Sequence, residues 1–252
     1  MAETIIEFQG IQKAFGDKVI YEDLTMDVRK GETLTIIGGS GVGKSVCLKL
    51  LIALLRPNAG RILAFGESVH DLPEAGLIEM RKRISMLFQG AALFDSMSVE
   101  DNIKYPLMEH KWGTTAQMDK RVTEVLELVD MPNAQKLRPA ELSGGMKKRV
   151  GLARAIAIQP EVILYDEPTT GLDPINVRRI NGLILSLQER LGVTSLVVTH
   201  DMDTVFTITD RLALVHEKRI AFVGTPEEAK SHDLRFLREF VQGGRGTLSE
   251  DL

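Results

Sequence analysis

The sequence predicts an α/β fold, with a mostly parallel, covered sheet, an N-terminal antiparallel β part and an inserted α-helical subdomain. Three observations lead to this prediction. A glycine-rich loop separates an apolar run at residues 34–37 from a helix-like stretch at 46–55. Strand and helix signals alternate from residue 162 onward, which is typical of a parallel sheet covered by helices. Between residues 99 and 158 the signals are mostly helical.

The elements follow from the spacing of apolar residues and from the positions of glycine and proline. Strands are expected at residues 4–8, 19–28, 34–37, 61–65, 84–88, 162–165, 195–199, 212–216 and 220–223. Helices are expected at residues 46–55, 72–83, 99–107, 115–129, 144–158, 176–191, 204–208 and 226–231. They form one domain over residues 1–242, with the helical subdomain inserted at about 90–158, and residues 243–252 form a flexible tail.

Composition excludes several classes of protein. The net charge of −4 argues against a nucleic-acid binder, which usually carries a basic surplus. The single cysteine allows no intramolecular disulfide. Residues 1–7 contain acids where a signal peptide has a basic region, and no apolar stretch approaches the roughly 18–20 residues needed to cross a bilayer. Work at a membrane would therefore require a partner protein.

The loop Gly38-Gly39-Ser40-Gly41-Val42-Gly43-Lys44-Ser45 has the pattern of a phosphate-binding loop, and it stands in the required order of strand, loop and helix. Glycines let consecutive backbone N–H groups converge on phosphate oxygens at a helix N-terminus. The Lys44 ammonium group suits the β- and γ-phosphates, and the Ser45 hydroxyl suits Mg²⁺. The motif predicts a P-loop NTPase.

Two further segments complete a candidate site. The apolar strand ending in Asp166-Glu167 places one carboxylate to hold Mg²⁺ and an adjacent one to act as a general base toward water. The segment Leu142-Ser143-Gly144-Gly145-Met146 opens a helix, with Ser143 suited to the N-cap. This helix start is a second position that can receive an anion.

Taken together, these motifs resemble those of ATP-binding cassette (ABC) ATPases over nearly the whole chain, in the family's order. The loop Gly38–Ser45 matches Walker A, Asp166-Glu167 matches Walker B with its catalytic glutamate, and residues 142–146 resemble the family signature with Met146 in place of glutamine. Gln89 matches the Q-loop glutamine, residues 171–174 resemble the D-loop, and His200 matches the switch histidine. Phe15 occupies the place of the aromatic residue that stacks on adenine.

The resemblance implies a role for each matched residue. The implied catalytic residues are Glu167, His200 and Lys44, and the implied Mg²⁺ ligands are Ser45, Gln89 and Asp166. The implied ATP contacts are Phe15, Gly38, Gly39, Ser40, Gly41, Val42, Gly43, Lys44, Ser45, Val46, Gln89, Ser143, Gly144, Gly145 and Asp173. The family sandwiches two ATP molecules between head-to-tail cassettes, so a homodimer is implied, in which Ser143, Gly144 and Gly145 act on the other subunit's ATP and Asp173 lies at the interface.

Residues 86–94, Met146 and the sequence Asp173-Pro174-Ile175 resemble the ATPase of Mla-type (MCE-associated) phospholipid transporters. That resemblance implies an integral membrane permease, an MCE-domain subunit and a place at the cytoplasmic face of the inner membrane. Residues 91–95 would line the groove for a permease helix, and the apolar character of residues 91–94 suits such docking. The alternative is ordinary packing of the helical subdomain. The alternatives are an amino-acid or other small-solute importer, a soluble Suf-type iron–sulfur assembly ATPase, and a non-transport cassette acting on DNA or ribosomes.

The remaining conspicuous residues have simpler interpretations. Cys47 is expected in the core. The run Lys147-Lys148-Arg149 is interpreted as a solvated helix face. The remaining histidines lack the spacing of metal ligands and are expected on the surface or in loops: His70, His110, His216 and His232.

Overall fold

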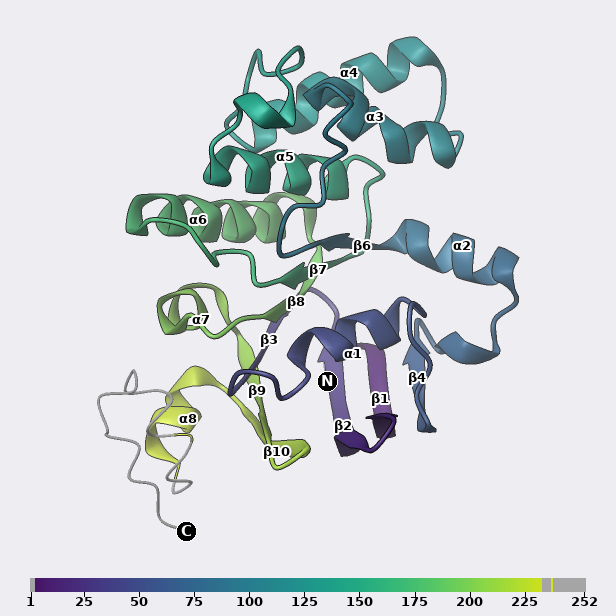
Figure 1. Ribbon diagram of the computed structural model, residues 1–252, viewed down its shortest axis with the longest axis vertical. Helices are drawn as coiled ribbons and strands as arrows, with labels where there is room; N and C mark the ends of the chain where they lie inside the picture. Colours follow the sequence, from purple (N-terminus) through teal and green to yellow (C-terminus); the bar gives the residue numbers. More distant parts are fainter. Residues whose placement is uncertain (1–2, 233–236, 238–252) are drawn as a thin grey trace.

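The computed structural model describes residues 3–232 and residue 237 (Figure 1). Its strands are β1 (Thr4–Phe15), β2 (Lys18–Arg29), β3 (Thr33–Gly38), β4 (Ala59–Ala64), β5 (Glu67–Ser68), β6 (Ile84–Leu87), β7 (Val162–Asp166), β8 (Thr194–Val198), β9 (Arg211–His216) and β10 (Arg219–Gly224). The helices are α1 (Lys44–Leu51), α2 (Glu74–Arg83), α3 (Val99–Glu109), α4 (Thr115–Leu128), α5 (Gly144–Ile156), α6 (Pro174–Leu191), α7 (Met202–Ile208) and α8 (Pro226–Ser231), with 3₁₀ helices η1 (Val69–Asp71) and η2 (Pro139–Glu141). The expected tail at residues 243–252 lies outside the described residues.

Within the described residues the strands form one ten-stranded sheet in the order β5-β4-β1-β2-β10-β9-β3-β8-β7-β6. The N-terminal strands β1, β2, β4 and β5 pair antiparallel, whereas β9, β3, β8, β7 and β6 run parallel. The two parts join where β2 meets β10, at the register pair Asp23 with Arg219. The predicted fold class is confirmed, including its antiparallel β part.

The parallel strands are buried on both faces, which explains their continuous apolar sequences. Along β7, Val162 and Leu164 belong to a hydrophobic cluster that includes α1 and the antiparallel strands. Their neighbours Ile163 and Tyr165 belong to a second cluster, formed with α3, α4, α5 and α6. Alternate residues thus point to opposite faces, and each face has its own helical cover.

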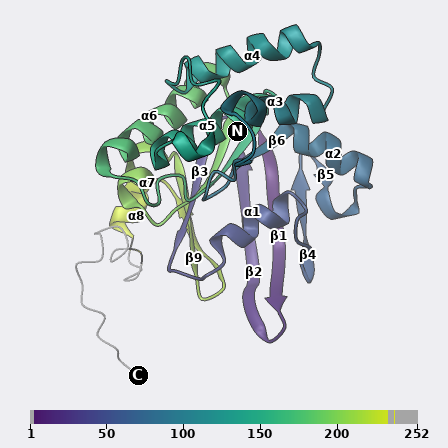
Figure 2. The ribbon, with the colours of Figure 1, turned by 45° about the horizontal axis from the view of Figure 1, so that its top comes forward.

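Helices α3, α4 and α5 lie together at one end of the molecule, with α6 beside α5 (Figures 1 and 2). Capping boxes fix the starts of the first two, with Ser98 and Asp101 opening α3 and Thr114 and Gln117 opening α4. These helices follow one another inside the stretch that the sequence analysis assigned to the inserted subdomain. The described helices include none whose length and hydropathy would let it span a bilayer.

Two elements have an end that differs from the prediction by more than two residues. The helix expected at residues 46–55 spans Lys44–Leu51, because Gly43 caps its start with a φ of 98° and Ala53 leaves helical geometry with a φ of 56°. The strand expected at residues 4–8 continues to Phe15, because β1 pairs with β2 as far as Phe15 and Lys18. A long strand supported on both sides tolerates polar residues that would weaken an isolated one.

Candidate functional site

The candidate site lies at the carboxyl ends of four neighbouring parallel strands. The phosphate-loop sequence follows β3, His200 follows β8, Asp166-Glu167 ends β7, and Gln89 follows β6. Ligands of open α/β sheets bind at this edge. A cavity of about 760 Å³ opens here and is lined by Phe15, Lys18, Ile20, Gly38, Gly39, Ser40, Gly41, Gly43, Lys44, Ser45, Val46, Gln89, Glu167 and His200.

Two glycines shape the loop, because their backbones lie close to neighbouring residues and have positive φ angles. Gly38 has a φ of 153°, and a Cβ there would lie 2.6 Å from the carbonyl oxygen of Val215. Gly43 has a φ of 98°, and a Cβ there would lie 2.3 Å from Cγ2 of Ile20. Side chains at either position would push the loop away from the sheet, so the concave path of the backbone depends on glycine.

The loop is also held from behind by a buried tyrosine. The hydroxyl of Tyr21, in β2, donates a hydrogen bond of 2.6 Å to the carbonyl oxygen of Gly43. Burial raises the pKa of Tyr21 well above its ordinary value, with the nearby thiol of Cys47 adding to the effect, so the hydroxyl keeps its proton and remains a donor. Cys47 itself is fully buried, as expected from the sequence.

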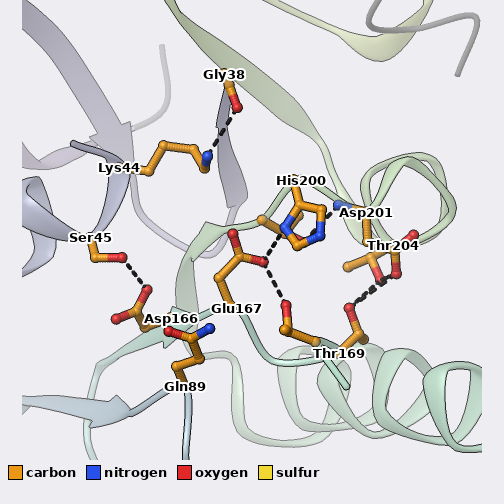
Figure 3. Close-up of polar contacts among 12 residues, drawn as sticks. Gly38, Lys44, Ser45, Gln89, Asp166, Glu167, Thr169, His200, Asp201 and Thr204 are labelled. Carbon is orange, nitrogen blue, oxygen red and sulfur yellow. Dashed lines mark hydrogen bonds and ion pairs between the residues drawn. The ribbon is translucent and has the colours of Figure 1, made fainter. Parts of the chain in front are cut away.

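Lys44 and Ser45 begin helix α1 and face the cavity (Figure 3). The Nζ atom of Lys44 donates to the carbonyl oxygens of Gly38 and Gly39, at 2.9 and 3.0 Å. Burial lowers the pKa of Lys44, and the Glu167 and Asp166 carboxylates oppose this shift by stabilising its charge. The site therefore combines a partly desolvated ammonium group with two carboxylates.

The residues expected to hold Mg²⁺ offer the oxygen donors that this ion prefers. The Ser45 hydroxyl donates a 2.6 Å hydrogen bond to Oδ1 of Asp166, and the side chain of Gln89 points into the same space (Figure 3). Hydroxyl, carboxylate and amide oxygens suit Mg²⁺, which also keeps waters and substrate phosphates as ligands. In the described part of the chain, no group of three or more His, Cys, Asp or Glu side chains could hold a metal ion. The donor set thus fits a phosphate-bound Mg²⁺ and no all-protein cage.

Glu167 is held at several points. Its Oε2 atom lies 2.9 Å from Nδ1 of His200 and accepts a 3.0 Å hydrogen bond from the Thr170 hydroxyl. Its backbone N–H donates to the carbonyl oxygen of Val198 at 2.8 Å. Its φ is 49°, a left-handed conformation that costs free energy in a residue other than glycine and is concentrated at functional sites.

Phe15 stands at the mouth of the cavity, 45% exposed, at the end of β1. The Nζ atom of Lys13 lies 4.7 Å from the centre of its ring. An exposed aromatic face beside a phosphate-binding loop offers a stacking surface for a nucleobase.

The expected residues Ser143, Gly144, Gly145 and Asp173 do not line this cavity. Ser143 caps α5 by accepting from the N–H of Met146 at 3.3 Å, and Asp173 caps α6. The two helix starts lie side by side, since a Cβ at Gly145 would meet the Asn176 amide oxygen at 2.8 Å. The Met146 side chain packs against the hydrophobic cluster of the helical end.

Lys148 is placed differently from the prediction. The solvated interpretation of residues 147–149 is wrong for this residue, which is only 5% exposed. Its Nζ atom donates to the carbonyl oxygen of Gln89 and, at 2.9 Å, to that of Glu167. The helical period could have revealed it, because Lys148 falls on the same stripe of α5 as the buried residues Gly145 and Leu152.

A buried polar network beside His200 was also missed. Asp201 accepts hydrogen bonds from the hydroxyls of Thr169 and Thr204, at 3.0 and 2.7 Å, and its N–H donates to the Thr199 hydroxyl at 3.0 Å. The network ties the segment after Glu167 to the segment after β8 (Figure 3). No sequence signal pointed to it, because only the parallel pairing of β7 with β8 brings these segments together.

A second, apolar hollow lies where α3 and α5 meet the end of β6. It measures about 500 Å³, and its lining includes Phe88, Ala92, Phe94, Tyr105 and Pro106. The rings of Phe94 and Tyr105 lie 4.9 Å apart and are 41% and 40% exposed.

Residues 91–95, which were expected to line a groove, do not all line this hollow. Ala91 is buried, and Leu93 packs into the cluster of the helical end, so both serve ordinary packing. Ala92 and Phe94 are left to line the apolar hollow.

The sequence of this chain is similar to those of known proteins. The family model described as "ABC transporter" matches residues 21–170, more than half of the chain. The intermembrane phospholipid transport system ATP-binding protein MlaF of Haemophilus influenzae is 41% identical over 244 residues, covering 96% of this chain and 92% of that protein. The probable ribonucleotide transport ATP-binding protein mkl of Mycobacterium leprae is 40% identical over 240 residues, covering 95% of this chain and 69% of that protein.

Solved structures resemble the chain in three dimensions. A dimeric ATP-binding cassette in a post-hydrolysis state, bound to ADP and Pi, has a TM-score of 0.80 and 27% identity, covering 88% of this chain and 98% of that one. The cbiO1 protein of Clostridium perfringens, part of the ABC transporter complex cbiONQ, has a TM-score of 0.82 and 29% identity, covering 94% and 98%.

Proposed function

This chain belongs to the ABC transporter family as an ATP-hydrolysing cassette, and on that premise we propose that it drives phospholipid movement through a membrane permease. Phospholipid is proposed as the cargo because of the 41% identity to MlaF of Haemophilus influenzae, which extends over 92% of that protein. The mycobacterial relatives are named for ribonucleotide transport, so the test must identify the cargo directly.

In the proposed site, the loop N–H groups and Lys44 hold the phosphates of ATP while Phe15 stacks on the adenine. Ser45, Asp166 and Gln89 would hold Mg²⁺, which would offset the negative charge of the phosphates. The phosphates thereby lie against α1, where the helix N-terminus favours negative charge.

Glu167 is the general base in this proposal. Its carboxylate accepts a proton from the attacking water, and the two contacts to Oε2, from His200 and Thr170, keep it aimed at the cavity. His200, whose side chain is 61% exposed, is free on its cavity side to contact the γ-phosphate. A fixed base costs no reorganisation at the moment of reaction.

The active form is a head-to-tail homodimer in our proposal. Ser143, Gly144 and Gly145 line no part of their own subunit's cavity, yet they form a helix start suited to an anion. Two such chains facing each other would complete each ATP site with the partner's helix. One of the structural relatives is a dimeric ATP-binding cassette, which supports dimerisation.

The apolar hollow beside Phe94 and Tyr105 is the proposed docking site for a cytoplasmic helix of the permease. Exposed aromatic rings in a hollow suit an amphipathic helix, which fills it with its own apolar residues. The cassette would thereby be held at the cytoplasmic face of the inner membrane, in a complex that includes an MCE-domain subunit.

The experiment is to isolate the native complex from membranes and to identify its subunits and its bound small molecules. Phospholipid together with a permease and an MCE-domain subunit is the expected result. A soluble scaffold, an amino-acid-binding subunit or a bound ribonucleotide as cargo would overturn the phospholipid proposal and leave the ATPase in place.

A further inference from the structure

One face of helix α5 grips the chain segment that follows β6. Arg154 donates from its two terminal nitrogens to the carbonyl oxygens of Ala91 and Ala92, both at 2.7 Å. One turn earlier, Gly151 approaches so closely that a Cβ there would lie 2.9 Å from Leu87 and 3.0 Å from Ala91. A further turn toward the helix start, Lys148 donates to the carbonyl oxygen of Gln89. The segment from Gln89 to the edge of the apolar hollow is thus attached to α5.

Lys148 makes a second contact that the other two residues do not. Its Nζ atom also donates to the carbonyl oxygen of Glu167, at 2.9 Å. A single ammonium group therefore joins the backbone of the Q-loop residue to the backbone of the proposed general base. Glu167 holds a left-handed φ of 49°, which needs support from its surroundings.

Burying the ammonium group of Lys148 costs more free energy than packing alone would require. Lys148 is only 5% exposed. Its hydrogen bonds go to backbone carbonyls, and a buried charge without full compensation costs free energy. Burial lowers the pKa of Lys148, while the Asp166 and Glu167 carboxylates stabilise its charge. An apolar or amide side chain would fill the space at lower cost if packing were the sole requirement.

We propose that Lys148 is a positioning residue for ATP hydrolysis, which couples the segment after Gln89, and so the docked permease, to the backbone of Glu167. The proposal rests on the proposed function for the roles of Glu167 and of the hollow. A shift of α5 or of the segment moves the ammonium group, and the Glu167 carbonyl moves with it. The carboxylate carbon of Glu167 is four bonds from the carbonyl carbon of the same residue, so its aim at the attacking water changes.

The test compares Lys148→Met, Lys148→Arg and Lys147→Met in the assembled transporter. Lys148→Met should lower kcat by about 10- to 100-fold, the order of loss expected when a catalytic group is misplaced by about 1 Å. KM for ATP should stay within about twofold, because the phosphate loop is untouched. Lys148→Arg keeps two donors and should recover much of kcat. Lys147→Met, a neighbour on the same helix that bonds neither carbonyl, should match the wild type.

Two further measurements separate the possible outcomes. A lower melting temperature with wild-type kcat per folded complex would make Lys148 merely structural and overturn the proposal. Glu167→Gln is measured in parallel: if it abolishes turnover while Lys148→Met does not change kcat, the coupling role fails and the general base stands. If Glu167→Gln keeps wild-type turnover, the proposed mechanism fails instead, and a drop in kcat with Lys148→Met would then act through another group.

Discussion

Nδ1 of His200 lies 2.9 Å from Oε2 of Glu167, so the second residue after β8 and the first residue after β7 meet directly across the carboxyl edge of the sheet. The contact is asymmetric in exposure: the His200 side chain is 61% exposed and the Glu167 side chain 11%. His200 therefore lies between the Glu167 carboxylate and solvent. This pair is the basis of the first prediction.

Glu167→Gln should retain ATP binding and lose hydrolysis by about 10²- to 10⁴-fold, because an amide cannot accept the proton of the attacking water. The amide keeps the shape of the side chain, so the cavity is preserved. Steady-state ATPase rates and ATP affinity, measured on the same preparation, check both parts. Thr170→Val removes one hydrogen bond to the carboxylate and should reduce kcat less than Glu167→Gln does. Wild-type turnover in Glu167→Gln would remove this residue from the mechanism.

Mixed dimers test whether the sites are shared between subunits. With Lys44→Ala in one subunit and Ser143→Arg in the other, head-to-tail pairing puts both lesions into one composite site and leaves the other intact. ATP trapped at the interface should therefore reach about half the wild-type occupancy, whereas either mutant homodimer should trap little. Equal occupancy in mixed dimers and in both mutant homodimers would contradict the shared site.

Phe94→Asp should detach the cassette from its permease without unfolding it. The ring is 41% exposed, so aspartate is tolerated in the free protein, but docking would desolvate its charge. The expected result is unchanged ATP binding by the isolated chain, together with loss of co-purification from membranes. Leu191→Asp is the control, because Leu191 is 40% exposed at the far end of α6 and lies outside the hollow. If both variants co-purify like the wild type, the hollow is not the docking site.

Tyr21→Phe should lower the free energy of unfolding by about 1 kcal/mol, the usual net value of a buried hydrogen bond. It removes the 2.6 Å bond to the Gly43 carbonyl oxygen, so ATP affinity should fall as well. Denaturant unfolding and ATP titration measure the two effects. Tyr105→Phe, altering a tyrosine that is 40% exposed, is the control and should change neither quantity. A Tyr21→Phe protein with unaltered stability and affinity would show that the bond does not support the loop.

The sequence allowed the fold class and most of the cavity-lining residues to be predicted, because both depend on local patterns; Lys18 and Ile20 line the cavity without having been expected there. The phosphate loop is recognisable from consecutive residues, and Asp166 ends a strand whose apolar run is plain. The prediction for Lys148 was wrong because it considered the charge of the side chain and not its position on the helix. For Leu93 the sequence left two alternatives open, because an apolar residue after a strand can face either a groove or a core. The Asp201 network depends on strands that are far apart in sequence, so no local sequence pattern could predict it.

The seam between β2 and β10 has a thermodynamic consequence. The register pair Asp23 with Arg219, together with the hydrogen bond from the N–H of Glu22 to the carbonyl oxygen of Lys218, continues the sheet from its antiparallel part to its parallel part. Phe15 belongs to the antiparallel part, and Lys44 begins the helix that follows β3 in the parallel part. A nucleotide stacked on Phe15 with its phosphates at Lys44 would span that seam as a staple. Because a ligand that binds only the folded state stabilises it by RT ln(1 + [L]/Kd), millimolar ATP would raise the melting temperature of both parts together and merge any separate unfolding steps into one.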